Sequence, residues 1–267
     1  MKNCLICDKR TRDLICNKCR KNPFKIEKGR HILAERKELK LLKSTYNKKI
    51  TEIKNLNTKI FWDSKLSKVQ YLRDQDGMTK DRIKTAYKFV PKSAKKIIDI
   101  GIGHGFLEEL LSKRKRIIIY GNDISKITIE NAQNRFEGYF RLESIYKMTY
   151  PKDFFDCILI LEVLEHVSPT RTFQVLSIIK KILNENGSLI LSVPMNEGLE
   201  HMKSNPSGHV RMYTEPLIRS ELELSGFKII KTKTLYAFSR FYLLKTFISK
   251  IFKKWEPNNI IILAKSL

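Results

Sequence analysis

The sequence predicts an α/β fold of the doubly wound type, in which helices cover both faces of a mostly parallel sheet. From about residue 80 onward, short apolar runs of strand length alternate with segments of helical periodicity. The runs are apolar at nearly every position, which is typical of strands that are buried on both faces. A glycine-rich turn joins the first of these strands to the next helix. Together these features favour a nucleotide-binding type of sheet.

The alternating segments can be assigned in chain order. We expect strands at residues 96–100, 116–120, 155–161, 188–193, 227–234 and within 258–267. We expect helices at residues 83–90, 105–112, 125–135, 170–183 and 214–225. Helix ends are indicated by Pro91, by the turn sequence Asn184 to Gly187 and by Gly226.

Two segments precede this α/β domain, which we assign to residues 80–267. Residues 1–22 are predicted to form a zinc-binding knuckle, and residues 23–79 a basic helical linker. Within the linker, apolar residues recur at three- and four-residue steps over residues 25–60, which predicts one long charged helix. Its narrow apolar stripe suits packing on the main domain or self-association with a second copy of the chain.

The cysteine spacing predicts a metal site. Two Cys-x2-Cys pairs, separated by eight residues, are formed by Cys4, Cys7, Cys16 and Cys19. Paired thiolates of this kind bind Zn²⁺ tetrahedrally, and a site closed by four ligands is structural. Clustered thiols and the lack of a signal-peptide pattern indicate a reducing, cytoplasmic location. Cys157 falls on a predicted strand and is expected in the core.

Positive charge is concentrated at both ends of the chain. The formal net charge is +24; residues 1–90 hold 25 basic and 10 acidic residues, and residues 226–267 hold 9 and 1. This distribution favours RNA or an anionic membrane surface as a partner of the ends, although a lysine-rich genome composition would produce the same excess. No run reaches the roughly 18 apolar residues of a membrane span.

The segment AFSRFYLLKTFISKIFKKW, residues 237–255, mixes large apolar residues with basic ones. The pattern predicts a basic amphipathic helix. Such a helix either lies on an anionic membrane, which would place the protein peripherally at that membrane, or packs on the core as a lid. The sequence leaves both alternatives open.

The glycine-rich turn has the pattern Asp-x-Gly-x-Gly-x-Gly and runs from Asp99 to Gly105. A carboxylate at its mouth would repel a pyrophosphate but suits a cationic ligand, and S-adenosylmethionine carries an ammonium, a sulfonium and no phosphate. Glycines allow close approach because no Cβ blocks the backbone. Asp123 ends the next strand, where a carboxylate can accept hydrogen bonds from ribose hydroxyls.

These motifs resemble those of class I S-adenosylmethionine-dependent methyltransferases, in particular the ubiquinone-type and small-molecule O-methyltransferases. The resemblance covers residues 80–235 and rests on IIDIGIGHG, IYGNDIS, FDCILILEVLEHV, NENGSLILSVP and GHVRMYT. It implies a seven-stranded Rossmann-like sheet with S-adenosylmethionine as cofactor. The residues that it assigns to the cofactor are Asp99, Gly101, Ile102, Gly103 and Gly105 at the methionine end, Asp123 at the ribose, Glu143 at the adenine amino group, and Ile124, Leu161 and Glu162 elsewhere in the pocket.

Two histidines are candidates for catalysis. His166 follows the strand 155–161 at the edge where open α/β sheets bind ligands, and His209 lies in a segment expected to cap the substrate. Either imidazole can act as a general base toward a hydroxyl; the alternative is a structural histidine. Glu162 and Glu165 flank His166 and are expected to orient its ring.

The predicted function is methyl transfer to a small-molecule, lipid-linked or glycan acceptor, at oxygen. The alternative is an RNA-modifying methyltransferase that holds RNA with the zinc knuckle and the basic ends. No Asn/Asp-Pro-Pro-Tyr/Phe motif, typical of enzymes that methylate amino groups, follows the strand 155–161. A third interpretation, a non-catalytic scaffold, conflicts with the intact glycine turn and Asp123.

Overall fold

The computed structural model describes residues 2–3, 10–11, 56–168, 171–196, 207–210, 213–252 and 255–266. Near the N-terminus the short strands β1 (Lys2–Asn3) and β2 (Arg10–Thr11) pair in antiparallel fashion. The four cysteines of the predicted zinc knuckle, Cys4, Cys7, Cys16 and Cys19, lie outside the described residues. Residues 25–55 of the predicted long helix also lie outside them.

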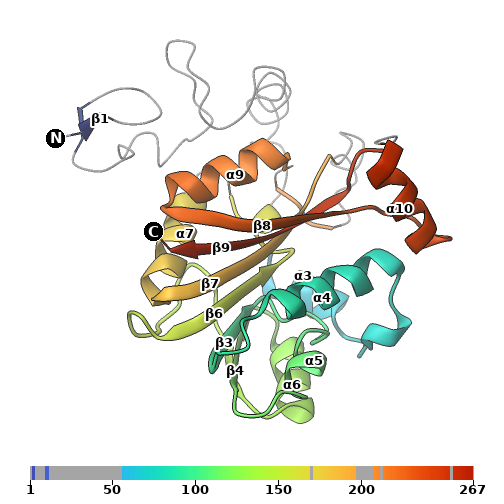
Figure 1. The fold of residues 1–267 in the computed structure, drawn as a ribbon. Coiled ribbons are helices and arrows are strands. Elements are labelled where there is room, and N and C mark those ends of the chain that lie inside the picture. Colours follow the sequence, from blue (N-terminus) through green and yellow to red (C-terminus); the bar gives the residue numbers. More distant parts are fainter. Residues whose placement is uncertain are drawn as a thin grey trace.

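A seven-stranded mixed sheet forms the centre of the molecule (Figure 1), with the strand order β5-β4-β3-β6-β7-β9-β8. Neighbours from β5 to β7 pair in parallel, whereas β9 runs antiparallel to both β7 and β8. The prediction of a mostly parallel sheet is therefore confirmed. The strands are β3 (Lys96–Ile100), β4 (Ile118–Asp123), β5 (Tyr139–Leu142), β6 (Phe155–Leu161), β7 (Leu183–Pro194), β8 (Phe227–Leu235) and β9 (Asn259–Ser266).

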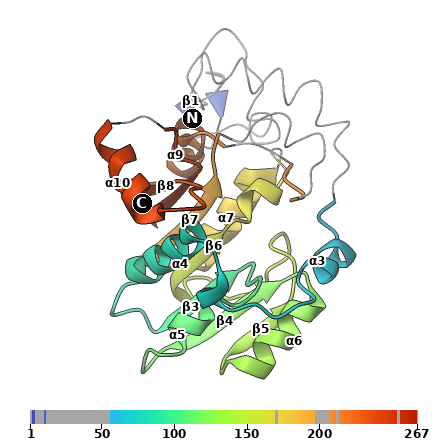
Figure 2. The ribbon, with the colours of Figure 1, turned by 90° about the vertical axis from the view of Figure 1, so that its right-hand side faces the viewer.

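Helices cover both faces of this sheet (Figure 2). The helices α7 (Thr172–Ile182) and α9 (Glu215–Leu224) pack on one face, and α4 (Gly77–Phe89), α5 (Glu108–Leu111) and α6 (Lys126–Arg135) on the other. Along β6, Ile158 and Ile160 pack in the core on the face covered by α7 and α9. Cys157 and Leu159 pack in the core on the opposite face. Burial on both faces explains why this strand is apolar throughout.

The main differences from the expected elements concern local turns. Strand β5 was not predicted, because it is an edge strand in which only Phe140 is buried. Strand β7 starts at Leu183 directly after α7, so the expected turn at 184–187 lies within the strand, beside a shift in the pairing register with β6. Helix α5 is only four residues long, shorter than the predicted helix 105–112.

The predicted helix 25–60 does not continue through its described end. Residues 56–58 are not helical, and a new helix, α3 (Lys59–Lys65), begins after them. Thr58 caps α3, since its hydroxyl accepts a hydrogen bond from the Phe61 N–H at 3.3 Å. The side chain of Asn57 donates to the carbonyl of Gly208 at 2.8 Å, which ties this segment to a distant loop instead of extending a helix.

Three further elements complete the described structure. Helix α10 (Tyr242–Phe252) is inserted between β8 and β9, and short 3₁₀ turns, η1 (Leu72–Asp74) and η2 (Leu164–His166), precede α4 and follow β6. Over the residues that the structure describes, helices long and apolar enough to cross a bilayer are absent.

Candidate active site

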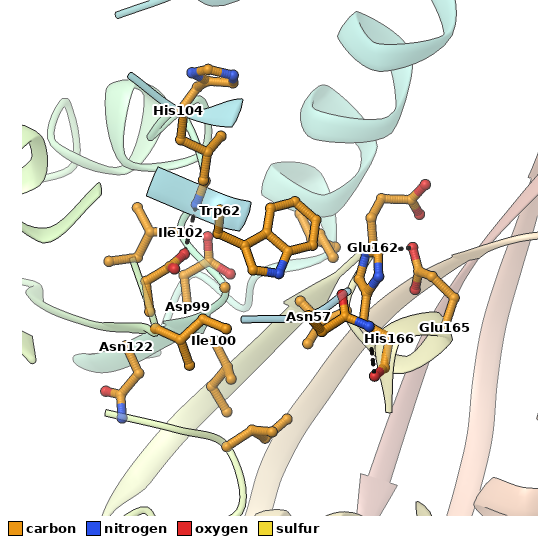
Figure 3. A pocket seen from close by; sticks show the side chains of 18 of the residues that line it. Asn57, Trp62, Asp99, Ile100, Ile102, His104, Asn122, Glu162, Glu165 and His166 are labelled. Atoms are coloured by element: carbon orange, nitrogen blue, oxygen red, sulfur yellow. Dashed lines mark hydrogen bonds and ion pairs between the residues drawn. The ribbon is translucent and has the colours of Figure 1, made fainter. Parts of the chain in front are cut away.

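A cavity of about 780 Å³ opens at the carboxyl ends of β3, β4 and β6 (Figure 3). This is the edge at which doubly wound sheets bind ligands. The cavity contains almost every site residue that the sequence predicted: Asp99, Gly101, Ile102, Gly103, Asp123, Ile124, Glu143, Leu161, Glu162, His166 and His209. Among the predicted cofactor-binding and catalytic residues, the exception is Gly105, which does not line it.

The glycine turn after β3 forms one wall. Gly101, Gly103 and Gly105 have φ angles of 85°, 57° and 73°, a conformation that costs other residues free energy. A Cβ on Gly103 would meet no atom within 4 Å, so the backbone at this point is open to a ligand. A Cβ on Gly105 would lie 2.8 Å from the ring of Phe136, so this glycine serves the packing of the turn.

Asp123 links this turn to the next strand. One carboxylate oxygen accepts from the N–H of Gly103 at 3.2 Å, and the other accepts from the N–H of Ser125 at 2.8 Å. Burial raises the pKa of Asp123 to about 6 even though these hydrogen bonds favour the ionised form. At neutral pH the group is mainly ionised and held in a fixed orientation, ready to accept hydrogen bonds from a ligand.

A second pair of carboxyl groups lies beneath the turn. Asp99 is 3% exposed and Glu108 is fully buried. Burial, followed by the nearby charge of Glu108, raises the pKa of Asp99 well above its usual range, and burial raises the pKa of Glu108 to about 7. The pair therefore favours a shared proton or a cation nearby. Glu108 was not predicted as a site residue, although its place in the first helical turn after the glycines is a signal that the sequence contains.

Glu143 follows the unpredicted strand β5 and is held from both sides. Its carboxylate accepts from the amide of Asn122 at 2.9 Å and from the hydroxyl of Thr149 at 2.8 Å. Asn122 in turn accepts from the buried hydroxyl of Tyr150 at 2.6 Å. This network fixes the carboxylate of Glu143 at the end of the cavity that Asp123 also lines.

Glu162 lines the cavity as expected, but its carboxylate bonds to residues other than His166. Its carboxylate accepts from the hydroxyl of Ser192 at 2.7 Å and from the amide of Asn259 at 2.9 Å, and it forms an ion pair with Arg82 at 3.1 Å. The chain turns sharply here, with a φ of 57° at Glu162. The expectation that Glu162 orients His166 is therefore wrong. The residue instead ties β6 to α4, β7 and β9.

His166 is the central polar residue of the opposite wall. Its Nδ1 lies 3.1 Å from the carbonyl oxygen of Gly208; because a carbonyl only accepts, we assign the proton to Nδ1. The other nitrogen, Nε2, then carries a lone pair and lies 3.9 Å from a carboxylate oxygen of Glu165. Burial, and then the neighbouring His209, lower the pKa of His166 to about 3, so the ring is uncharged at neutral pH.

Glu165, His166 and His209 form a compact cluster. Each offers one ligand atom, and these atoms lie within 4.8 Å of one another. The two imidazole rings are 5.0 Å apart between centroids. A carboxylate beside two imidazoles can orient an acceptor hydroxyl, and it is also a donor set of the type that binds divalent cations.

The segment around α3 adds residues that sequence reasoning missed. The indole of Trp62 lies edge-on to His166, with ring centroids 4.8 Å apart, as Figure 3 shows. Asp63 accepts from the hydroxyl of Ser125 at 2.7 Å and thereby holds α3 against the start of α6. Residues 57–65, assigned above to the linker, thus form part of the cavity wall. A lone tryptophan within a basic segment was the available signal.

Comparisons of the sequence agree with this geometry. The methyltransferase domain family matches residues 71–232. An uncharacterised protein of Methanocaldococcus jannaschii is 28% identical over 64% of this chain and 72% of its own length. The mitochondrial ubiquinone biosynthesis O-methyltransferase of Dictyostelium discoideum is 27% identical over 47% of this chain, and the match spans 43% of that protein.

Solved structures share the fold. A SAM-dependent methyltransferase from Archaeoglobus fulgidus superposes with a TM-score of 0.58 at 19% identity, covering 73% of this chain and 96% of that one. The N-methyltransferase NodS from Bradyrhizobium japonicum, in complex with S-adenosyl-L-homocysteine, gives 0.60 at 15% identity, covering 79% and 98%. The matched residues run from before β3 into β8 and include the glycine turn, His166 and His209, whereas Asn57 and Trp62 of the same cavity lie before them. The chain therefore belongs to the methyltransferase domain family and is an enzyme of that class.

Proposed function

We propose that this enzyme transfers a methyl group from S-adenosylmethionine to a hydroxyl oxygen of a small-molecule, lipid-linked or glycan acceptor. The observation that carries the proposal is that one cavity is lined both by the glycine turn with Asp99 and Asp123 and by the cluster of Glu165, His166 and His209. A donor site and a group able to receive a proton thus share one cavity.

The donor side suits S-adenosylmethionine on chemical grounds. The open backbone at Gly103 allows close approach of the methionine part, and Asp99, which lines the cavity, supplies negative charge for its ammonium or sulfonium once the carboxyl group has lost its proton. Asp123 accepts hydrogen bonds from ribose hydroxyls, and Glu143 from the adenine amino group. Among proteins of this fold, NodS and the magnesium protoporphyrin IX methyltransferase of Synechocystis were solved with S-adenosyl-L-homocysteine.

The acceptor side supplies orientation and a proton acceptor. In the transfer, the acceptor oxygen forms a bond to the methyl carbon while the carbon–sulfur bond breaks, and the sulfonium takes up that electron pair. The proton of the hydroxyl passes to Nε2 of His166, whose lone pair is free because Nδ1 donates to Gly208. The low proton affinity of the buried ring makes this transfer dependent on the nearby carboxylate of Glu165. Holding the reactants in line provides much of the rate enhancement.

A labelling experiment tests the acceptor class. The enzyme is incubated with a methyl-labelled donor and a cell extract, which is then separated into lipid, small-molecule, glycan, protein and RNA fractions. We expect the label in the lipid, glycan or small-molecule fraction, and far less label with the His166→Asn variant. Label in RNA that is lost after ribonuclease treatment would contradict the proposed acceptor and support the alternative.

A further inference from the structure

Helix α10 presents its polar side to the protein. Thr246 and Ser249 are 7% and 0% exposed. The ring of Tyr242 lies against Gly77, and its hydroxyl donates to Asp81 of α4 at 3.1 Å. The hydroxyl of Ser249 donates a hydrogen bond to the carbonyl of Lys245, one turn earlier in the helix, at 2.7 Å. The helix is therefore anchored on α4 by hydroxyl groups.

The opposite side of α10 is apolar and faces outward. At 100° per residue, Leu243, Leu244, Phe247, Ile251 and Phe252 occupy one half of the helix surface, away from Thr246 and Ser249. Their exposed fractions are 80%, 58%, 62%, 56% and 71%, and Phe241 and Trp255 beside the helix are 74% and 39% exposed. This arrangement is the reverse of an ordinary surface helix, which buries its apolar side. It contradicts the alternative in which this side of the helix packs on the core as a lid.

The charged residues of the chain segment that carries this apolar face are almost all basic. Residues 226–267 contain nine basic residues and one acidic residue, Glu256. Arg240 is exposed just before the helix and Lys245 is half-buried on its flank. The sequence adds Lys250, Lys253 and Lys254 at its other end. Large apolar and aromatic side chains bordered by cations form the pattern of a helix that lies in the surface of an anionic bilayer.

We propose that α10 docks on an anionic lipid bilayer, with the Leu243, Phe247 and Ile251 side of the helix inserted among the acyl chains and the basic residues at the lipid phosphates. A second copy of the chain fits this face less well. A symmetric contact would place each basic helix against an identical basic helix, and like charges across an interface oppose association. A bilayer surface removes the apolar area from water and neutralises the cations at the same time.

Docking at α10 would hold the cavity close to the membrane. Tyr242 of α10 bonds to Asp81, and the next two residues of α4, Arg82 and Ile83, line the cavity. Figure 1 shows α10 beside α4 on the same side of the molecule. The proposal itself does not depend on the acceptor, since binding to vesicles is measured without catalysis.

Flotation of the full-length chain with vesicles tests the proposal. Two vesicle types are compared, phosphatidylcholine alone and phosphatidylcholine with phosphatidylglycerol. The variant Phe247→Glu/Ile251→Glu removes two side chains of the docking face, and Ile230→Glu on β8, where Ile230 is 49% exposed, is the matched control. Donor affinity, measured by calorimetry, checks that each variant remains folded.

We expect the wild type and Ile230→Glu to bind vesicles that contain phosphatidylglycerol, and high salt to weaken that binding. The double variant should bind about a hundredfold more weakly, since each buried side chain contributes about tenfold. The proposal is overturned if the wild type does not bind these vesicles. It is also overturned if the double variant binds as tightly as the wild type, because the contact would then lie at another basic segment. A wild-type dimer that the double variant converts to a monomer overturns it as well, because the face would then bind a second copy.

Discussion

The two walls of the cavity are built in different ways. The donor wall comes from one continuous stretch of chain, where Asp99, the glycine turn and Asp123 lie within two neighbouring strands and the turns after them. The opposite wall joins segments far apart in the sequence, with Asn57 and Trp62 meeting His166 and Gly208. The first wall depends on backbone shape and the second on tertiary packing. Variants in each wall should therefore separate donor binding from turnover.

The largest expected effect is on turnover, from His166. His166→Asn keeps a side-chain N–H for the Gly208 carbonyl but lacks a basic nitrogen at the position of Nε2. We expect kcat to fall by about 10²–10⁴-fold. Donor affinity, measured by calorimetry, should stay unchanged because the donor wall is intact. Full activity of His166→Asn would mean that the histidine has only a structural role.

A smaller but distinct effect is expected from Asp123 on the donor wall. Asp123→Asn removes the charge while keeping a similar shape, and we expect donor affinity to fall by about tenfold or more, the cost of losing charge-assisted hydrogen bonds. Glu130→Gln is the matched control, because Glu130 lies on the neighbouring helix α6 with a side chain that is 53% exposed and outside the cavity lining. Equal donor affinity in Asp123→Asn and wild type would contradict the placement of the ribose.

Trp62 should affect the acceptor alone. Trp62→Ala removes the ring that lies edge-on to His166, and we expect KM for the acceptor to rise by about tenfold. Ile60→Ala, on the same helix but with Ile60 81% exposed, should leave KM unchanged. If Trp62→Ala weakened donor binding instead, the division of the cavity into two walls would be wrong.

The pH dependence of donor binding should be the smallest effect. Because the pKa of Asp123 is about 6, donor affinity should fall by less than about tenfold as the pH drops from 7 to 5. Calorimetry at several pH values measures the slope, and Asp123→Asn should flatten it. An unchanged slope in that variant would assign the dependence to another group.

Protein stability should change in the opposite direction. A carboxyl group whose folded pKa is raised from 3.8 to about 6 binds its proton more tightly in the folded state. The ligand-free protein therefore gains stability as the pH falls from 6 toward 4, by up to about 3 kcal/mol from this group. Denaturant unfolding with and without donor separates this gain from the loss of donor binding.

The same contrast explains what the sequence could predict. Strand 155–161 was predicted at its observed bounds because both of its faces are buried, and that requirement leaves an unbroken apolar run. The glycine turn and Asp123 were found because their chemistry is local. Strand β5 was not predicted because an exposed edge strand needs only one buried residue, here Phe140, and so leaves no regular apolar pattern in the sequence. The direction of Glu162 toward Ser192 and Asn259, and the approach of Trp62 to His166, depend on tertiary contacts that no local pattern encodes.

The contact of Asp63 with the start of α6 has a consequence for the binding of donor and acceptor. One carboxylate oxygen of Asp63 accepts from the Ser125 hydroxyl and from the N–H of Ile127, two and four residues after Asp123. A nucleoside that restricts the motion of the turn at Asp123 would therefore also stabilise the position of α3, the helix that carries Trp62. By thermodynamic reciprocity, the methyl donor and the acceptor would each bind with higher affinity when the other is already bound. Acceptor affinity measured with and without S-adenosyl-L-homocysteine would reveal this coupling.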